Sequence, residues 1–118
     1  MIKAIIIDDE PRASGILELM IERFVPEIER VWCCNDARQA AALIHELKPD
    51  LVFMDIKMPV MDGYTAARLI HEFNPGQKIV AQTAYEGDRN IAKQNGCIDF
   101  IAKPFTRQHL LSVIKAHI

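Results

Sequence analysis

The sequence predicts an α/β fold in which a parallel β-sheet is covered by helices on both faces. Short apolar runs alternate along the chain with longer segments in which apolar residues recur at helical spacing. Three of the runs are nearly continuous rather than alternating, as expected for parallel strands that are buried on both faces. Strict alternation of strands and helices is typical of parallel sheets, and right-handed crossovers place the helices on both sides.

Five apolar runs are expected to form the strands of this sheet. They are Ala4–Ile7, Ile28–Cys33, Leu51–Met54, Ile79–Ala81 and Ile98–Ala102. The pattern does not give the order in which the strands lie side by side.

The first helix is expected over residues 12–24. Pro11 is tolerated in a first helical turn, and Pro26 prevents the helix from continuing. One apolar stripe is expected to face the core. It consists of Ile16, Leu19, Met20 and Phe24.

The second and third helices are expected over residues 37–47 and 63–73. Asp36 is a plausible N-cap for the second, and Asn74-Pro75-Gly76 closes the third. The apolar positions of the second helix are Ala40, Leu43, Ile44 and Leu47.

The fourth helix, over about residues 87–95, is the weakest of the set because Ile91 and Ala92 are its clear apolar anchors. Asn95-Gly96 is typical of a left-handed C-cap. The fifth helix is expected over residues 107–117, with Thr106 as its cap. Its apolar positions are Leu110, Leu111 and Ile114.

Composition favours one globular unit over residues 1–118, with no linker, repeat or low-complexity segment. The net charge of −2 with mixed signs gives no argument for direct nucleic-acid binding. Membrane insertion is not expected, because no apolar run approaches the roughly 20 residues that a bilayer requires. The opening MIKAIIIDDE turns acidic too early for a secretion signal, so we expect a cytoplasmic protein.

The cysteines do not form a disulfide framework. There are three, and Cys33 and Cys34 are adjacent. We expect buried, reduced thiols, including Cys97. Zinc is not expected, because the four histidines are scattered and none pairs with a cysteine at ligand spacing.

Polar residues that could carry chemistry follow four of the predicted strands. They are Asp8 and Asp9, Asp55, Thr83 and Lys103. In an open α/β sheet, ligands bind outside the carboxyl ends of the strands, where these residues should meet. Each alone could be a helix cap, a turn residue or part of a solvated loop.

Together these residues indicate a phosphoryl site beside a metal ion. Three aspartates at one edge would repel each other unless a cation lies among them. Oxygen ligands favour a hard ion such as Mg²⁺, with Mn²⁺ as a possible substitute. Lys103 can neutralise an added anion, and Thr83 can donate a hydrogen bond to it. No Gly-rich phosphate loop is present.

Four stretches carry a resemblance to a known family. They are IIIDDE at 5–10, DIKMPVMDG at 55–63, QTA at 82–84 and KPF at 103–105. With them the chain resembles, over nearly its whole length, the receiver domain of two-component response regulators and hybrid histidine kinases. The resemblance implies a flavodoxin-like, doubly wound sheet in the order 2-1-3-4-5, flanked by five helices.

The resemblance also implies a role for each site residue. Asp55 is expected to be the phosphoacceptor, and Thr83 and Lys103 are expected to bind the phosphoryl group. The expected metal ligands are Asp9 directly, Asp8 largely through water, Asp55, and the backbone carbonyl of Lys57. Phe100 takes the place of the family's rotating aromatic side chain.

The implied function is signal transduction. A histidine kinase or histidine phosphotransfer protein would donate the phosphoryl group to Asp55 in a Mg²⁺-dependent reaction. Thr83 would then move toward the group and Phe100 would turn inward. The changed surface would act on an output domain or target protein. No enzymatic activity is expected beyond the chain's own phosphorylation and dephosphorylation.

Two alternatives remain open from the residues. A metal-dependent hydrolase with an aspartate nucleophile would need a general acid or base beside it, and the matched residues supply none. A receiver-like binding module independent of phosphorylation would not take up phosphate from acetyl phosphate.

The lifetime of the signal should depend on Lys57 and Tyr85, which flank the approach of water in the family. Tyr85 is bulky, so we expect it to shield the phosphoryl group and slow its hydrolysis. The context of the chain stays open. The opening MIKAIIIDDEPRA resembles regulators that carry a C-terminal output domain, whereas the stretch TAYEGDRNIAKQNGCIDFIAKPF resembles hybrid kinases.

Overall fold

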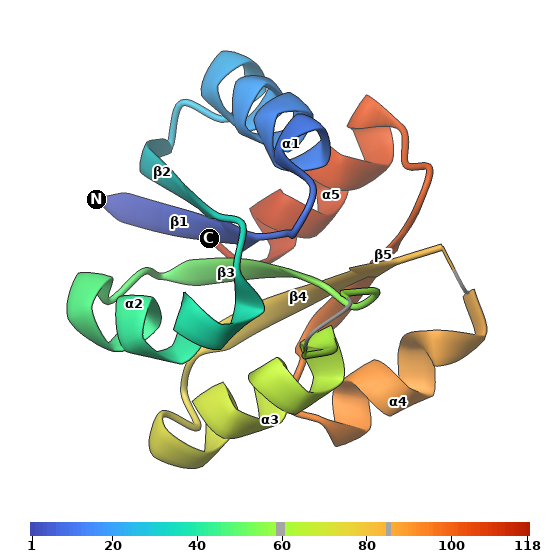
Figure 1. Cartoon of the computed structure of the whole chain (residues 1–118). Helices are drawn as coiled ribbons and strands as arrows, with labels where there is room; N and C mark the ends of the chain where they lie inside the picture. Colours follow the sequence, from blue (N-terminus) through green and yellow to red (C-terminus); the bar gives the residue numbers. More distant parts are fainter. Residues whose placement is uncertain (59–60, 85) are drawn as a thin grey trace.

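The computed structural model describes residues 1–58, 61–84 and 86–118, with the side chain of Glu86 left out. In this part of the chain, five parallel strands form one sheet in the order β2-β1-β3-β4-β5 (Figure 1). The strands are β1 Ile2–Ile7, β2 Ile28–Cys34, β3 Leu51–Asp55, β4 Lys78–Thr83 and β5 Asp99–Ala102. The predicted fold class and strand order are confirmed.

Helices cover both faces of the sheet, because successive residues of each buried strand point to opposite sides. The helices are α1 Pro11–Phe24, α2 Ala40–Leu47, α3 Gly63–Phe73, α4 Arg89–Gln94 and α5 Arg107–Ala116. Helices α1 and α5 lie on one face, and α2, α3 and α4 on the other (Figure 1). Alternate residues of β3 therefore lie in two separate cores. Phe53 lies in the core on the side of α1 and α5, and Met54 lies in the core on the side of α2, α3 and α4.

The predicted stripe of α1 is wrong at two of its four residues, whereas Met20 packs against the core as expected. Leu17 and Ile21 are buried, whereas Ile16 and Leu19 are 60% and 59% exposed. Apolar residues occupy adjacent positions along this helix, so periodicity alone fits two neighbouring stripes. The small Ser14 continues the buried stripe toward the N-terminus, which a search for large apolar residues misses.

The second and fourth helices begin later than predicted, each after a 3₁₀ turn: η1 Ala37–Gln39 and η2 Glu86–Asp88. Asp36 caps η1, with its carboxylate accepting a hydrogen bond from the N–H of Arg38. In α4, Ala92 is buried as expected, but Ile91 is 43% exposed, so its assignment as an anchor is wrong.

Two predicted helix caps are confirmed. Gly96 has a positive φ of 93°, which confirms the left-handed cap. Thr106 caps α5 by accepting from the N–H of His109.

Cys33 is exposed, contrary to expectation, because β2 is an edge strand with incomplete cover. Cys34 and Cys97 are buried.

The strand register brings the polar residues to one edge. Ile7 lies beside Met54, Asp55 beside Gln82, and Thr83 beside Ala102. The residues at or just beyond the ends of β1, β3, β4 and β5 therefore meet at the carboxyl edge of the sheet. Among the described residues, no helix is long and apolar enough to span a membrane.

Candidate active site

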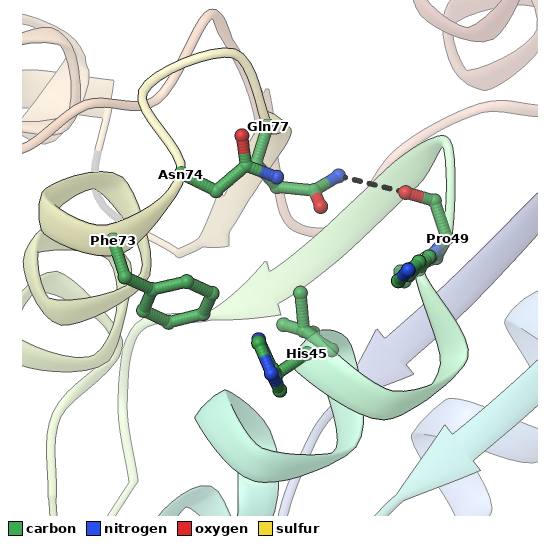
Figure 2. Close-up of a pocket in the computed structure, with 7 residues that line it drawn as sticks. His45, Pro49, Phe73, Asn74 and Gln77 are labelled. Carbon is green, nitrogen blue, oxygen red and sulfur yellow. Dashed lines mark hydrogen bonds between the residues drawn. The ribbon is translucent and has the colours of Figure 1, made fainter.

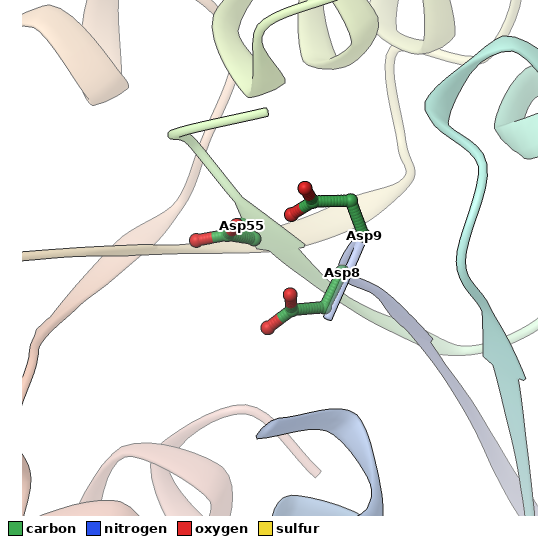
Figure 3. Close-up of side chains that lie close together, drawn as sticks. All are labelled: Asp8, Asp9 and Asp55. Atoms are coloured by element: carbon green, nitrogen blue, oxygen red, sulfur yellow. The ribbon is translucent and has the colours of Figure 1, made fainter. Parts of the chain in front are cut away.

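Three carboxylates converge at the carboxyl edge of the sheet. Asp8 and Asp9 follow β1 and Asp55 ends β3, and one oxygen from each lies within 4.8 Å of the others. Figure 3 shows their carboxylate ends gathered on the same side of the backbone. Asp8 and Asp55 are buried, whereas Asp9 is exposed. This oxygen-only set fits a hard divalent cation.

The ammonium group of Lys103 lies against two of these carboxylates. Its Nζ lies 3.0 Å from Oδ1 of Asp55 and 3.4 Å from Oδ2 of Asp8. The backbone N–H of Lys103 donates to the carbonyl of Thr83 at 2.7 Å, which fixes the loop after β5. Lys103 therefore reaches the acidic cluster from a position set by β4.

The ionisation of Asp55 and Lys103 reflects this partly buried pairing. Burial raises the pKa of Asp55, Lys103 offsets part of that rise, and the charges of Asp8 and Asp9 add to it. Burial lowers the pKa of Lys103, but the hydrogen bond and charge of Asp55 outweigh it, so the pKa of Lys103 rises. An added positive charge would favour the ionised form of Asp55.

The loop after β1 is held by hydrogen bonds that fix Asp8. Oδ1 of Asp8 accepts from the N–H of Glu10 at 2.9 Å. The side chain of Asn35 donates to the carbonyl of Asp8 at 2.8 Å and to Oγ of Ser14 at 3.2 Å. The sequence did not identify Asn35 as a partner of Asp8, because the contact joins the end of β2 to the β1–α1 loop.

The loop after β3 turns sharply so that α3 starts close to Asp55. The N–H groups of Met58 and Gly63 both donate to the carbonyl of Ile56, at 3.1 and 3.0 Å. Asp62 caps α3 by accepting from the N–H of Thr65. Lys57 lies on this loop with an exposed side chain. The role of its carbonyl as a metal ligand stays a prediction.

Thr83 and Phe100 are both buried. The hydroxyl of Thr83 donates to Oδ2 of Asp88 at 3.3 Å. The guanidinium of Arg89 lies 5.0 Å from the centroid of the Phe100 ring. Phe100 is thus buried beside Arg89, and the expected turn of its ring on phosphorylation stays a prediction. Neither Asp88 nor Arg89 was identified from the sequence, because both lie in the weakly patterned fourth helical segment.

Tyr85 and Pro59 lie outside the described residues, so the expected shielding by Tyr85 stays a prediction. One buried donor in the site region has no hydrogen-bond partner among the described residues, the side-chain amide nitrogen of Gln82. Gln82 lines a groove of about 350 Å³ beside Lys103. The groove is completed by Glu10, Ala13, Ile16, Met20, Pro104 and Phe105.

A second cavity, of about 370 Å³, opens at the opposite edge of the sheet, between the ends of α2 and α3. Figure 2 shows His45 and Phe73 facing each other there, with their ring centroids 6.0 Å apart. The amide of Gln77 donates to the carbonyl of Pro49 at 3.1 Å. This cavity holds none of the candidate site residues predicted from the sequence, so the carboxyl edge is the candidate site.

Comparison with known proteins identifies the family to which the chain is similar. A family model described as the response regulator receiver domain matches residues 4–115. A curated relative, a protein-glutamate methylesterase/protein-glutamine glutaminase from Geobacter sulfurreducens, is 36% identical over 104 residues. The match covers 87% of this chain but 28% of that protein.

Solved structures extend the likeness. The response regulator domain of Thermotoga maritima CheB is 28% identical with a TM-score of 0.87, covering 99% of this chain and 96% of that one. The receiver domain of a sensor histidine kinase from Pseudomonas aeruginosa is 30% identical with a TM-score of 0.83, covering 98% and 95%. That structure is described with a magnesium ion coordinated in the active site cleft. With this fold, this acidic edge and a match over residues 4–115, the chain belongs to the response regulator receiver domain family.

Proposed function

We propose that this chain carries a signal as an acyl phosphate on Asp55, and that residues 1–118 act as one receiver domain. One observation supports this above all. The Asp55 carboxylate lies 3.0 Å from Lys103 and within reach of two further carboxylates, at the edge of the sheet. A carboxylate paired with a cation and flanked by oxygen ligands is suited to phosphoryl transfer, in which the protein mainly positions groups and neutralises charge.

The reaction is a displacement at phosphorus. A carboxylate oxygen of Asp55 forms the new P–O bond while the bond from phosphorus to the donor breaks. With a phosphohistidine donor, the electron pair of the P–N bond returns to the imidazole, which then takes a proton from solvent. With acetyl phosphate, the pair leaves on acetate and no proton is needed. Lys103 neutralises charge on the transferred group, and the hydroxyl of Thr83 donates a hydrogen bond to that group.

The chemistry of the acidic cluster fits Mg²⁺ or Mn²⁺. Asp9 and Asp55 would hold the ion directly, with Asp8 acting through water and the Lys57 carbonyl as a further ligand. When bound, the ion would supply positive charge to the phosphoryl oxygens. The magnesium ion described in the related Pseudomonas aeruginosa receiver supports this assignment.

The groove beside Lys103 supports docking of a protein donor. Ile16 and Leu19 expose apolar surface on α1, and Ile16 and Met20 line the groove that leads to Lys103. A histidine kinase or histidine phosphotransfer protein could cover this surface while its phosphohistidine reaches Asp55. The downstream partner would be an output domain or target protein that responds to changes around α4, β5 and α5.

Replacing the acceptor tests the proposal. Asp55→Asn should abolish incorporation of labelled phosphate from acetyl phosphate in Mg²⁺, because the amide is a poor nucleophile. Asp50→Asn is a matched control, since Asp50 precedes β3 at the opposite edge of the sheet. It should incorporate phosphate at the wild-type rate. Wild-type incorporation by folded Asp55→Asn would refute the assignment.

A further inference from the structure

Asp88 ends η2 and directly precedes α4, with a helical backbone at φ −79° and ψ −3°. This is not the extended backbone of an N-cap, and the Asp88 side chain makes no cap hydrogen bond. Its carboxylate instead accepts from the hydroxyl of Thr83 at 3.3 Å, and its backbone carbonyl accepts from the hydroxyl of Tyr64 at 3.2 Å. The side chain is thus directed toward the active site.

We propose that Asp88 is a positioning residue that holds the Thr83 hydroxyl in a resting orientation and yields it when a phosphoryl group arrives. This inference rests on the proposed function. A hydroxyl has one proton, so it cannot donate fully to two acceptors at once. While Thr83 donates to Asp88, it is not available to a phosphoryl oxygen. Asp88 therefore competes with the phosphoryl group for the same donor.

The geometry favours the phosphoryl group over Asp88 as the acceptor of the Thr83 hydrogen bond. At 3.3 Å, the Thr83–Asp88 bond is long for an O–H···O hydrogen bond, which is usually about 2.7 to 2.8 Å. A charged phosphoryl oxygen that accepts at the ordinary distance would form a stronger hydrogen bond than this long contact. A change of acceptor for the Thr83 hydrogen bond, from Asp88 to the phosphoryl group, is therefore favourable in free energy.

The next residue connects the same helix start to Phe100. The Arg89 guanidinium lies over the Phe100 ring, so adjacent residues at the start of α4 contact both predicted switch residues. Ala92 is the buried residue of this short helix, which leaves it lightly anchored. Release of Asp88 would therefore be passed to α4 and, through Arg89, to Phe100.

A double-mutant cycle isolates the action of Asp88 through Thr83. The initial rate of phosphate incorporation from acetyl phosphate in Mg²⁺ is measured for the wild type, Asp88→Ala, Thr83→Ala and the double variant. Asp88→Ala should raise the rate by about threefold to tenfold, because the competing acceptor is lost. In the Thr83→Ala background, the same change should have no effect. Asp88→Asn, which keeps a carbonyl acceptor, should lie between Asp88→Ala and the wild type.

Tyr64→Phe is a matched control, because it removes the donor to the backbone carbonyl of Asp88 and leaves the carboxylate in place. Its rate should stay within about twofold of the wild type. The contact itself is checked without phosphate, by the ¹³C shift of the Thr83 methyl group. That shift should move in Asp88→Ala and stay nearly unchanged in Tyr64→Phe.

Three outcomes would overturn the inference. The first is an acceleration that persists without the Thr83 hydroxyl, since it would show that Asp88 acts by charge alone. The second is an unchanged or reduced rate in folded Asp88→Ala, and the third is a Thr83 methyl shift that ignores Asp88. If the wild type takes up no phosphate while the methyl shift responds to Asp88, the proposed function has failed and the contact is structural.

Discussion

Gly63 shows how tightly a single residue is constrained beside the acceptor. A Cβ atom at this position would collide with the backbone oxygen of Asp55 and lie 2.8 Å from the Cα of Ile56. The constraint is lack of space, because α3 begins directly against the end of β3. Gly15 on α1 is the opposite case, because a Cβ atom there would meet nothing within 4 Å beyond the backbone of its own helix.

These two glycines give a paired prediction. Gly63→Ala should lower the free energy of unfolding by about 2 to 4 kcal/mol, because the backbone around Asp55 must shift to admit the methyl group. Gly15→Ala should raise it by about 0.5 to 1 kcal/mol, because alanine restricts the unfolded chain and favours the helix. Urea unfolding monitored by circular dichroism measures both. Equal stability of Gly63→Ala and the wild type would contradict the crowding argument.

The sequence predicted where the candidate site residues gather better than it predicted the contacts that hold them. Asp8, Asp55 and Lys103 follow buried strands, and parallel topology alone brings them to one edge. Asn35 and Asp88 were missed as partners of Asp8 and Thr83. Their side-chain contacts depend on loop conformation, which neither apolar periodicity nor strand position specifies.

At the scale of elements, α1 shows where periodicity stops being informative. The helix carries apolar residues at 16, 17, 19, 20 and 21, so two adjacent stripes satisfy the same spacing. The structure buries Leu17 and Ile21 against the sheet and leaves Ile16 and Leu19 exposed. The choice depends on how α1 lies against β1 and α5, which is information from tertiary packing.

Two isoleucines on this helix therefore predict opposite costs. Ile21→Ala should destabilise the protein by about 2 to 4 kcal/mol, because it removes fully buried apolar atoms and leaves a cavity. Ile16→Ala should change stability by less than about 0.5 kcal/mol, because Ile16 is mostly in solvent. Chemical unfolding of both variants provides the comparison. A larger cost for Ile16→Ala would restore the stripe predicted from the sequence.

At the scale of the whole molecule, the proposed metal site would link stability to metal binding. Without a cation, three carboxylates within 4.8 Å repel each other, and Lys103 offsets part of that charge. A ligand that binds the folded state stabilises it by mass action, by about 2.7 kcal/mol at one hundred times its Kd. Binding of the proposed ion would therefore couple the stability of the fold to its proposed site.

Millimolar Mg²⁺ should raise the melting temperature of the wild type, and EDTA should reverse the rise. Asp9→Ala should lose this response and should be as stable as the wild type, or more so, in EDTA, because one repelling charge is gone. Asp50→Asn should keep the full response, since it lies at the far edge of the sheet. A wild-type melting temperature that ignores Mg²⁺ would count against the metal site.

The global topology was predictable from two different sources. Alternation of buried strands and amphipathic helices is a local pattern, and it correctly predicted a parallel sheet with helices on both faces. The order β2-β1-β3-β4-β5 depends on pairings between distant segments, so the resemblance to receiver domains supplied it. Local patterns such as the left-handed Gly96 were also predictable, because backbone chemistry there is decided by one residue.

Alkaline pH should expose another global link, through the buried thiol of Cys97. Burial raises the pKa of this thiol from 9.0 to about 12. Between these values the unfolded chain has lost the proton and the folded chain still holds it. Stability contributed by the neutral thiol is therefore complete below pH 9.0 and is lost as pH rises toward 12, by about 1.4 kcal/mol per pH unit.

Cys97→Ala removes this titration, so its stability should change less steeply than that of the wild type above pH 9.0. Near neutral pH the variant should be less stable, because it loses a buried sulfur. As pH rises, the gap should narrow by about 1.4 kcal/mol per unit and then reverse sign. Val113→Ala, which also removes buried apolar atoms but no ionisable group, should show a cost that does not depend on pH. Urea unfolding of the three proteins across alkaline pH measures these gaps, and a constant gap for Cys97→Ala would show that its thiol titrates alike in both states.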